Sequence, residues 1–206
     1  MECSLNQTKK GESKMADLSS ECLYFEDPGP QNTDKTLKLA AKRAQALEIR
    51  DIVVASTTGE TGLKAAEFFN GYNLIVVTHS TGFREPDLQE LPEQKKEEIE
   101  KKGGKVLTCQ HAFGGVNRAV RKKLATYELD EIIAHTFRTF GEGMKVAVEI
   151  TLMAADAGLI RTDREALAIA GTGKGADTVL VVKPANAQTF FDLEIREILC
   201  KPRILK

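Results

Sequence analysis

Short apolar runs that alternate with helical segments constrain the fold of this chain more than any other feature. Residues 52–55 read Ile-Val-Val-Ala, and residues 73–78 contain a similar run. A run that is apolar at successive positions is typical of a strand buried on both faces of a sheet. We expect further strands of this kind at residues 105–108, 166–170 and 178–182.

The segments between these runs have the spacing of helices. In residues 33–47, apolar side chains recur at three- and four-residue intervals, and Asn32 or Thr33 is expected to cap the helix. Pro92 suits the first position of another helix. The same reading predicts further helices at residues 59–69, 93–102, 114–124, 130–137 and 141–157.

The order of these elements predicts the fold class. Strands that alternate with helices form parallel sheets covered by helices on both faces. Residues 171–177, between the last two predicted strands, are too few for a parallel crossover, which needs about a dozen residues. The last two strands should therefore pair antiparallel. The prediction is an α/β fold: a three-layer α/β/α sandwich with a mostly parallel sheet and an antiparallel edge strand.

Length and charge limit the domain organisation and the partners. The chain has 206 residues and a net charge of −1, without a long basic block. We predict a flexible arm at residues 1–20 and one ligand-binding domain at residues 21–206. The sequence has no cluster of basic residues of the kind that binds nucleic acid. No run reaches the ~20 apolar residues that span a bilayer. A homo-oligomer is compatible with the sequence, which does not decide the point.

The cysteines indicate the compartment. They are far apart and form no CxxC pair, which disfavours a zinc site or a disulfide framework: Cys3, Cys22, Cys109 and Cys200. The N-terminus is polar and has no apolar core of a secretory signal. We therefore expect free thiols in a reducing, cytoplasmic compartment.

The strongest candidate for a binding site follows the strand at residues 52–55. Hydroxyl and glycine residues join this strand directly to a helix: Ser56, Thr57, Thr58, Gly59, Glu60, Thr61 and Gly62. The first turn of a helix has unpaired N–H groups and a positive dipole end, which together favour an anion. The glycines are expected to let the backbone approach a phosphate closely. Glu60 should face solvent or pair with Lys64. The plainer alternative is a capped turn without a ligand.

A second glycine-rich loop joins the last two predicted strands. It contains Gly171, Thr172, Gly173 and Lys174, and it lacks the Walker A pattern because no helix follows. It is either a second contact for the same ligand or a flexible hairpin loop.

These two segments resemble the C-terminal domain of pyruvate kinase. Residues 52–61 are similar to the strand and phosphate loop of that domain, where hydroxyls matching Ser56, Thr58 and Thr61 hold an effector phosphate. Residues 168–182 are similar to its closing hairpin. The resemblance covers most of the α/β core and none of the catalytic barrel, so it does not imply kinase activity.

Residues 24–202 resemble more closely a stand-alone pyruvate kinase C-terminal domain-like family. Members of this family are small proteins that have been seen with flavin mononucleotide (FMN). The resemblance therefore implies FMN as the cofactor, with its phosphate at residues 56–62. A sugar-phosphate or nucleotide-sensing module and a flavin-dependent oxidoreductase are alternatives, and whether the protein is an enzyme stays open.

Two further loops at strand ends could hold the flat flavin ring, which needs apolar walls and a few polar groups. The candidate residues are Thr78, His79, Gly82 and Phe83 after one strand, and His111, Phe113, Gly114 and Gly115 after the next. Each histidine could instead bond to backbone, and each phenylalanine could belong to the core. No HxH or HExxH spacing suggests a metal site.

Several charged residues lie in or near the helix that is predicted at residues 141–157. Arg138 or Lys145 could offset the charge of a ligand, while Glu149 and Asp156 are expected to face solvent. No GxSxG motif and no Ser/His/Asp order indicates a hydrolase. The catalytic residues are therefore unknown at this stage.

Overall fold

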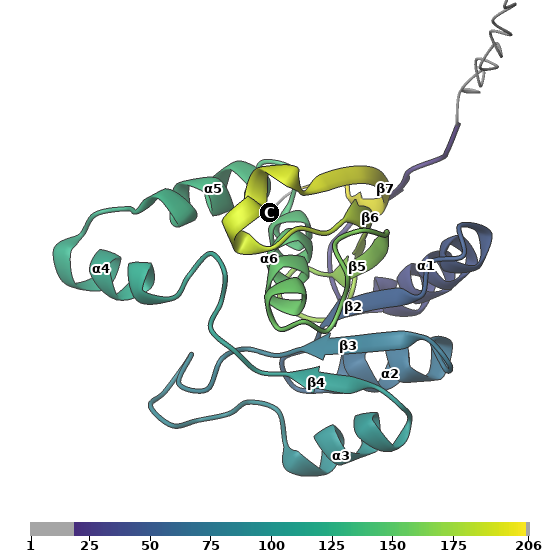
Figure 1. The fold of residues 1–206 in the computed structure, drawn as a ribbon, viewed down its shortest axis with the longest axis horizontal. Helices are drawn as coiled ribbons and strands as arrows, with labels where there is room; N and C mark the ends of the chain where they lie inside the picture. Colours follow the sequence, from purple (N-terminus) through teal and green to yellow (C-terminus); the bar gives the residue numbers. More distant parts are fainter. Residues whose placement is uncertain (1–18, 205–206) are drawn as a thin grey trace, which may run out of the picture.

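The computed structural model describes residues 19–204 and contains one seven-stranded sheet (Figure 1). The strand order is β1-β7-β6-β5-β2-β3-β4. The strands are β1 Leu23–Phe25, β2 Asp51–Ala55, β3 Asn73–Val77, β4 Lys105–Leu107, β5 Ala166–Ala170, β6 Thr178–Lys183 and β7 Glu194–Pro202. The α-helices are α1 Thr33–Ala46, α2 Glu60–Phe68, α3 Glu93–Lys101, α4 Val116–Leu124, α5 Leu129–Arg138 and α6 Glu142–Asp156, and two short 3-10 helices are η1 Pro30–Asn32 and η2 Ala187–Asp192. The predicted arm lies almost entirely outside the described residues.

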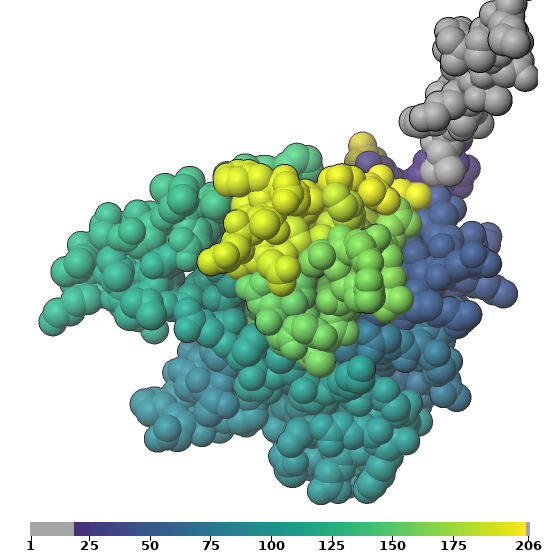
Figure 2. All heavy atoms as spheres, in the orientation of Figure 1, coloured from purple at the N-terminus to yellow at the C-terminus, as the bar shows by residue number. Residues whose placement is uncertain are grey.

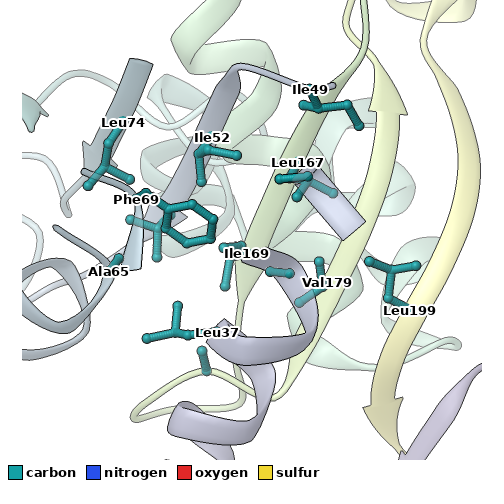
Figure 3. Close-up of a cluster of buried hydrophobic side chains, with 14 of the residues drawn as sticks. Leu37, Ile49, Ile52, Ala65, Phe69, Leu74, Leu167, Ile169, Val179 and Leu199 are labelled. Carbon is teal, nitrogen blue, oxygen red and sulfur yellow. The ribbon is translucent and has the colours of Figure 1, made fainter. Parts of the chain in front are cut away.

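The sheet separates two apolar layers, as the predicted three-layer sandwich requires. On one face, residues from α1, α2 and α3 pack against alternate strand residues such as Ile52 and Ile169 (Figure 3). On the other face, α5 and α6 cover the intervening residues, such as Val53 and Ala168. Both faces of β2 and β5 are therefore buried, which explains why their sequences are apolar at successive positions.

Strand pairing confirms the mostly parallel sheet and its antiparallel part. β2 pairs parallel with β3 and β5, and β3 pairs parallel with β4. β6 pairs antiparallel with β5, as predicted from the short loop. The antiparallel part extends further than predicted, because β7 also pairs antiparallel with β6 and β1 lies outside β7. The sequence pattern did not reveal β7, since charged residues interrupt its apolar positions.

The start of α1 differs from the expected cap. Asn32 occupies the N-cap position, but its side chain makes no cap hydrogen bond and instead donates to the carbonyl of Asp27 at 2.8 Å. Thr33 begins the helix, and its Oγ1 accepts a hydrogen bond from the N–H of Ala176 at 3.0 Å. The hydroxyl therefore ties α1 to the loop between β5 and β6.

The topology brings several loops to one edge of the sheet. β2, β3, β4 and β5 are parallel, so their carboxyl ends lie together. α4 projects to one side of the body, at the left in Figure 1, and Figure 2 shows the same teal part of the chain in the same orientation. None of the helices within residues 19–204 is long and apolar enough to cross a membrane.

Candidate functional site

Hydrogen bonds fix the loop between β2 and α2, and two of its backbone N–H groups have no acceptor in the described chain. The N–H of Ser56 donates to the carbonyl of Val77 at 2.9 Å, and the hydroxyl of Ser56 accepts from the N–H of Gly62 at 3.0 Å. Within the described chain, no protein group accepts a hydrogen bond from the N–H of Glu60 or Thr61. These two donors at the start of α2 are the groups that an anion would use.

The hydroxyls of this loop divide into buried and accessible ones. Ser56 and Thr61 are buried, with 5% and 7% of their surfaces exposed. Thr57 is half-buried and Thr58 is exposed. Thr57 and Thr58 therefore offer the more accessible hydroxyls to a ligand, whereas Ser56 mainly holds the loop.

The glycines of the loop are also required by packing. A Cβ at Gly62 would lie 2.7 Å from Cγ1 of Val76 and 3.1 Å from Cδ1 of Ile99. Gly59 has a φ of +89°, and a Cβ there would lie 2.8 Å from Leu91. Both positions therefore require glycine because α2 lies close to β3 and to the segment around α3. Close approach of a phosphate to this backbone stays a prediction.

Glu60 is exposed, as one of its two predicted placements requires, and it pairs with a lysine other than Lys64. Lys95 on α3 forms an ion pair with Glu60, and this contact lowers the pKa of the Glu60 carboxyl. Lys64 instead pairs with Asp34 at 2.8 Å. The negative charge of Glu60 is therefore balanced from a neighbouring helix.

A chain of polar contacts links this loop to the segment that follows β3. The Oγ1 of Thr57 lies 3.4 Å from Nε2 of His79, and Nδ1 of His79 lies 2.6 Å from a carboxylate oxygen of Glu90. Arg84 contacts the other oxygen of Glu90 at 2.7 Å. Glu90 therefore fixes the orientation of His79, so that its Nε2 faces the Thr57 hydroxyl.

Thr78 and Gly82 shape this segment from within. Thr78 is buried, and its Oγ1 lies 2.7 Å from Oγ1 of Thr108 at the end of β4. Gly82 has a φ of +80° and donates its N–H to the carbonyl of Leu88 at 3.0 Å. Both residues therefore hold the loop in shape, and their contact with a ligand stays a prediction.

Three aromatic rings of these loops stack on one another. The rings of His79 and Phe83 stack with their centroids 4.0 Å apart, and those of Phe83 and His111 stack at 5.0 Å. Phe113 is buried and packs with Phe137 and Phe190 in the core. A flavin ring would therefore either stack on this cluster or separate its rings. Phe113 belongs to the hydrophobic core, which was the alternative predicted for each phenylalanine.

Arg118 on α4 completes the cluster. Its guanidinium lies 4.5 Å from the ring centroid of Phe83, and no residue of the described chain accepts a hydrogen bond from its buried Nε. Gly114 and Gly115 make room for side chains, since a Cβ there would meet Arg118 and Gln110, respectively.

A buried ion pair lies beneath the cluster and corrects the prediction for α6. Lys145 and Glu149 are 4% and 3% exposed and form an ion pair, so Glu149 does not face solvent, whereas Asp156 is exposed. Glu149 also accepts a hydrogen bond from the N–H of Phe113 at 3.0 Å. Lys145 therefore neutralises a buried carboxylate. Arg138 pairs with Glu142 at 2.7 Å.

Burial gives His111 an unusual titration. Desolvation lowers the pKa of His111 from 6.5 to about 4, although the nearby Glu149 raises it in part. The neutral ring accepts a hydrogen bond from the N–H of Ser80 on Nε2 at 3.4 Å. The unfolded chain binds a proton at His111 below pH 6.5, whereas the folded chain does so only near pH 4.

We therefore predict that His111 makes the fold less stable as the pH falls from 6.5 to about 4, because the unfolded state binds more protons in this window. A His111→Gln variant keeps an acceptor for Ser80 but does not titrate. Its stability should fall less over the same range, as measured by thermal unfolding at several pH values. Identical pH dependence of the two proteins would contradict this role.

The glycine-rich loop between β5 and β6 lies at the same edge. Val54 pairs with Ile169, so the segments that follow β2 and β5 start side by side. Asp177 is fully buried and accepts hydrogen bonds from the N–H groups of Gly29 and Thr172 at 3.3 and 3.1 Å. The base of the loop is therefore fixed, while Gly173 and Lys174 at its tip are exposed.

Several residues of this site could not be recognised from the sequence. Glu90, Arg118 and Asp177 have no motif around them, and each acts on residues distant in the chain. The only sequence signal is a charged residue beside an otherwise apolar or glycine-rich segment, and such residues usually face solvent.

Comparison with known protein families finds a family model that matches this chain. The family model described as "Pyruvate kinase, alpha/beta domain" matches residues 34–182. The matched segment is more than half of the 206-residue chain and includes both loops of the candidate site. β1 and β7 lie outside it.

Proposed function

The chain belongs to the pyruvate kinase alpha/beta domain family, and on this premise we propose that it binds a phosphorylated small molecule, foremost FMN, at residues 56–62. The observation that carries the proposal is the pair of open N–H groups of Glu60 and Thr61 at the start of α2. The accessible hydroxyls of Thr57 and Thr58 add donors beside them. This combination matches the needs of a phosphate.

The residues around the loop are compatible with the rest of FMN. The His79–Phe83–His111 cluster offers an aromatic surface for the flavin ring. The guanidinium of Arg118, 4.5 Å from the ring centroid of Phe83, places a positive charge beside this surface. When bound, FMN would supply hydride or single-electron chemistry, while the protein would hold its phosphate and orient its ring.

Two other functions remain proposals with narrower support. A sugar-phosphate or nucleotide-sensing module would need only the loop at residues 56–62 and the tip of the β5–β6 loop, where Lys174 is exposed. A flavin-dependent oxidoreductase would also need the aromatic cluster. The free thiols of Cys22, Cys109 and Cys200 support a reducing, cytoplasmic setting.

We predict that FMN binds at least ~10-fold more tightly than riboflavin. Riboflavin lacks the phosphate, and one charge-assisted hydrogen bond contributes about 1.5–3 kcal/mol, which is roughly 10- to 150-fold in affinity. Quenching of flavin fluorescence measures both affinities, and the visible absorption of purified protein shows whether a flavin is already bound. Equal affinities would contradict a phosphate anchor.

A further inference from the structure

The contacts among Thr57, His79 and Glu90 define the proton positions on the histidine. A carboxylate oxygen only accepts, so the 2.6 Å contact requires that Nδ1 of His79 carries a hydrogen. In the neutral ring, Nε2 is then an acceptor and faces the hydroxyl of Thr57 at 3.4 Å. Such contacts are often long before a substrate binds. The three side chains thus have the order hydroxyl, imidazole, carboxylate.

The hydroxyl of Thr57, the nucleophile in this series, is accessible from outside the protein. Thr57 is half-buried and lies between the end of β2 and the start of α2, while the side chains of His79 and Glu90 are 29% and 11% exposed. The N–H groups of Glu60 and Thr61 follow on the same loop without acceptors in the described chain. A nucleophile, an oriented base and N–H donors for a developing negative charge are the parts that acyl transfer requires.

The arrangement favours acyl transfer over phosphoryl transfer. In acyl transfer, one histidine can accept the proton of the nucleophile and return it to the leaving group, because both are bonded to the same carbon. Phosphoryl transfer places these groups on opposite sides of phosphorus and relies on cations. Here the nearby Arg84 is already paired with Glu90.

We infer that Thr57, His79 and Glu90 form an esterase site for small carboxylic esters. This inference goes beyond phosphate binding and does not rest on it, and the two ligands would compete for the open N–H groups of Glu60 and Thr61. Thr57 and His79 would be catalytic, and Glu90 would be a positioning residue that holds His79 and stabilises its charged form.

The reaction is balanced with water as the second substrate. Oγ1 of Thr57 attacks the ester carbonyl carbon, its proton passes to Nε2 of His79, and the carbonyl electrons move to the oxygen facing the open N–H groups. The intermediate collapses, and the departing alkoxide takes the proton from His79. Water, deprotonated by His79, then attacks the acyl-threonine. The proton returns to Thr57, which leaves as the carboxylic acid is released.

The test uses p-nitrophenyl acetate and the full chain. We expect turnover above the rate of buffer, and we expect an acetyl group on Thr57 in peptides mapped by mass spectrometry after acid quenching. Thr57→Val and His79→Gln should each lower kcat/KM by ~100-fold or more, since acid–base catalysis typically contributes at least this much. Thr57→Ser should retain activity.

Two further variants separate catalysis from structure. Thr126→Val, an exposed threonine between α4 and α5, is the matched control and should leave turnover unchanged. Glu90→Gln should lower kcat while KM stays nearly unchanged, because the carboxylate that orients His79 is lost and no group that would bind the ester changes. Turnover that survives Thr57→Val, or acetyl groups found only on other residues, would overturn the inference. If a variant fails to fold, the acetyl map of the parent decides.

Discussion

Replacing Lys145 by methionine is expected to lower the free energy of unfolding by about 3–5 kcal/mol, the usual cost of removing one partner of a buried ion pair. Lys145 and Glu149 are both almost fully buried on α6. Methionine fills a similar volume but leaves the carboxylate of Glu149 with the N–H of Phe113 at 3.0 Å and the ring of His111 at 3.7 Å. Urea denaturation measures the change.

The double variant Lys145→Met/Glu149→Gln is the control for this prediction. Glutamine retains an oxygen that can accept from Phe113, and neither charge remains in the interior. Replacing a whole buried pair is often nearly neutral, so the double variant should recover much of the lost stability. A loss of less than ~1 kcal/mol in the single variant would show that the pair behaves like a solvated surface pair.

The sequence predicts the central part of the fold because local pattern and burial agree there. β2 and β5 are buried on both faces, and their apolar runs carry that information directly. β7 was missed because Glu194, Arg196 and Glu197 lie on its partly exposed end. Glu197 bonds to Arg43 on α1 at 2.8 Å, a contact distant in the chain. Such a strand is specified by its neighbours rather than by its own pattern.

For the candidate site, the sequence predicts where the residues lie in the fold better than it predicts what their side chains do. Ser56 to Gly62 does join a strand to a helix, but Gly62 is required by contact with Val76 and Ile99. His79 does lie at the same edge, yet its partner Glu90 comes from a loop that no periodicity describes. Roles depend on contacts between loops, and these form only when the sheet brings the loops together.

The second large effect concerns Thr58. We expect Thr58→Glu to weaken FMN binding by about 100-fold or more, because juxtaposed like charges cost several kcal/mol. Thr58 is exposed and directly precedes Gly59, the N-cap of α2. A carboxylate there suits the helix dipole, so the fold should stay intact. Calorimetric titration with FMN measures the loss.

The most direct test of phosphate binding at this loop is to titrate FMN into the parent, Thr58→Glu and Thr58→Gln under the same conditions. Glutamine has nearly the size of glutamate without its charge, so it separates repulsion from steric effects. The account predicts that Thr58→Gln binds FMN within ~10-fold of the parent, since at most one hydrogen bond changes, whereas Thr58→Glu loses about 100-fold or more. Equally tight binding of FMN by all three proteins would contradict a phosphate site at the start of α2.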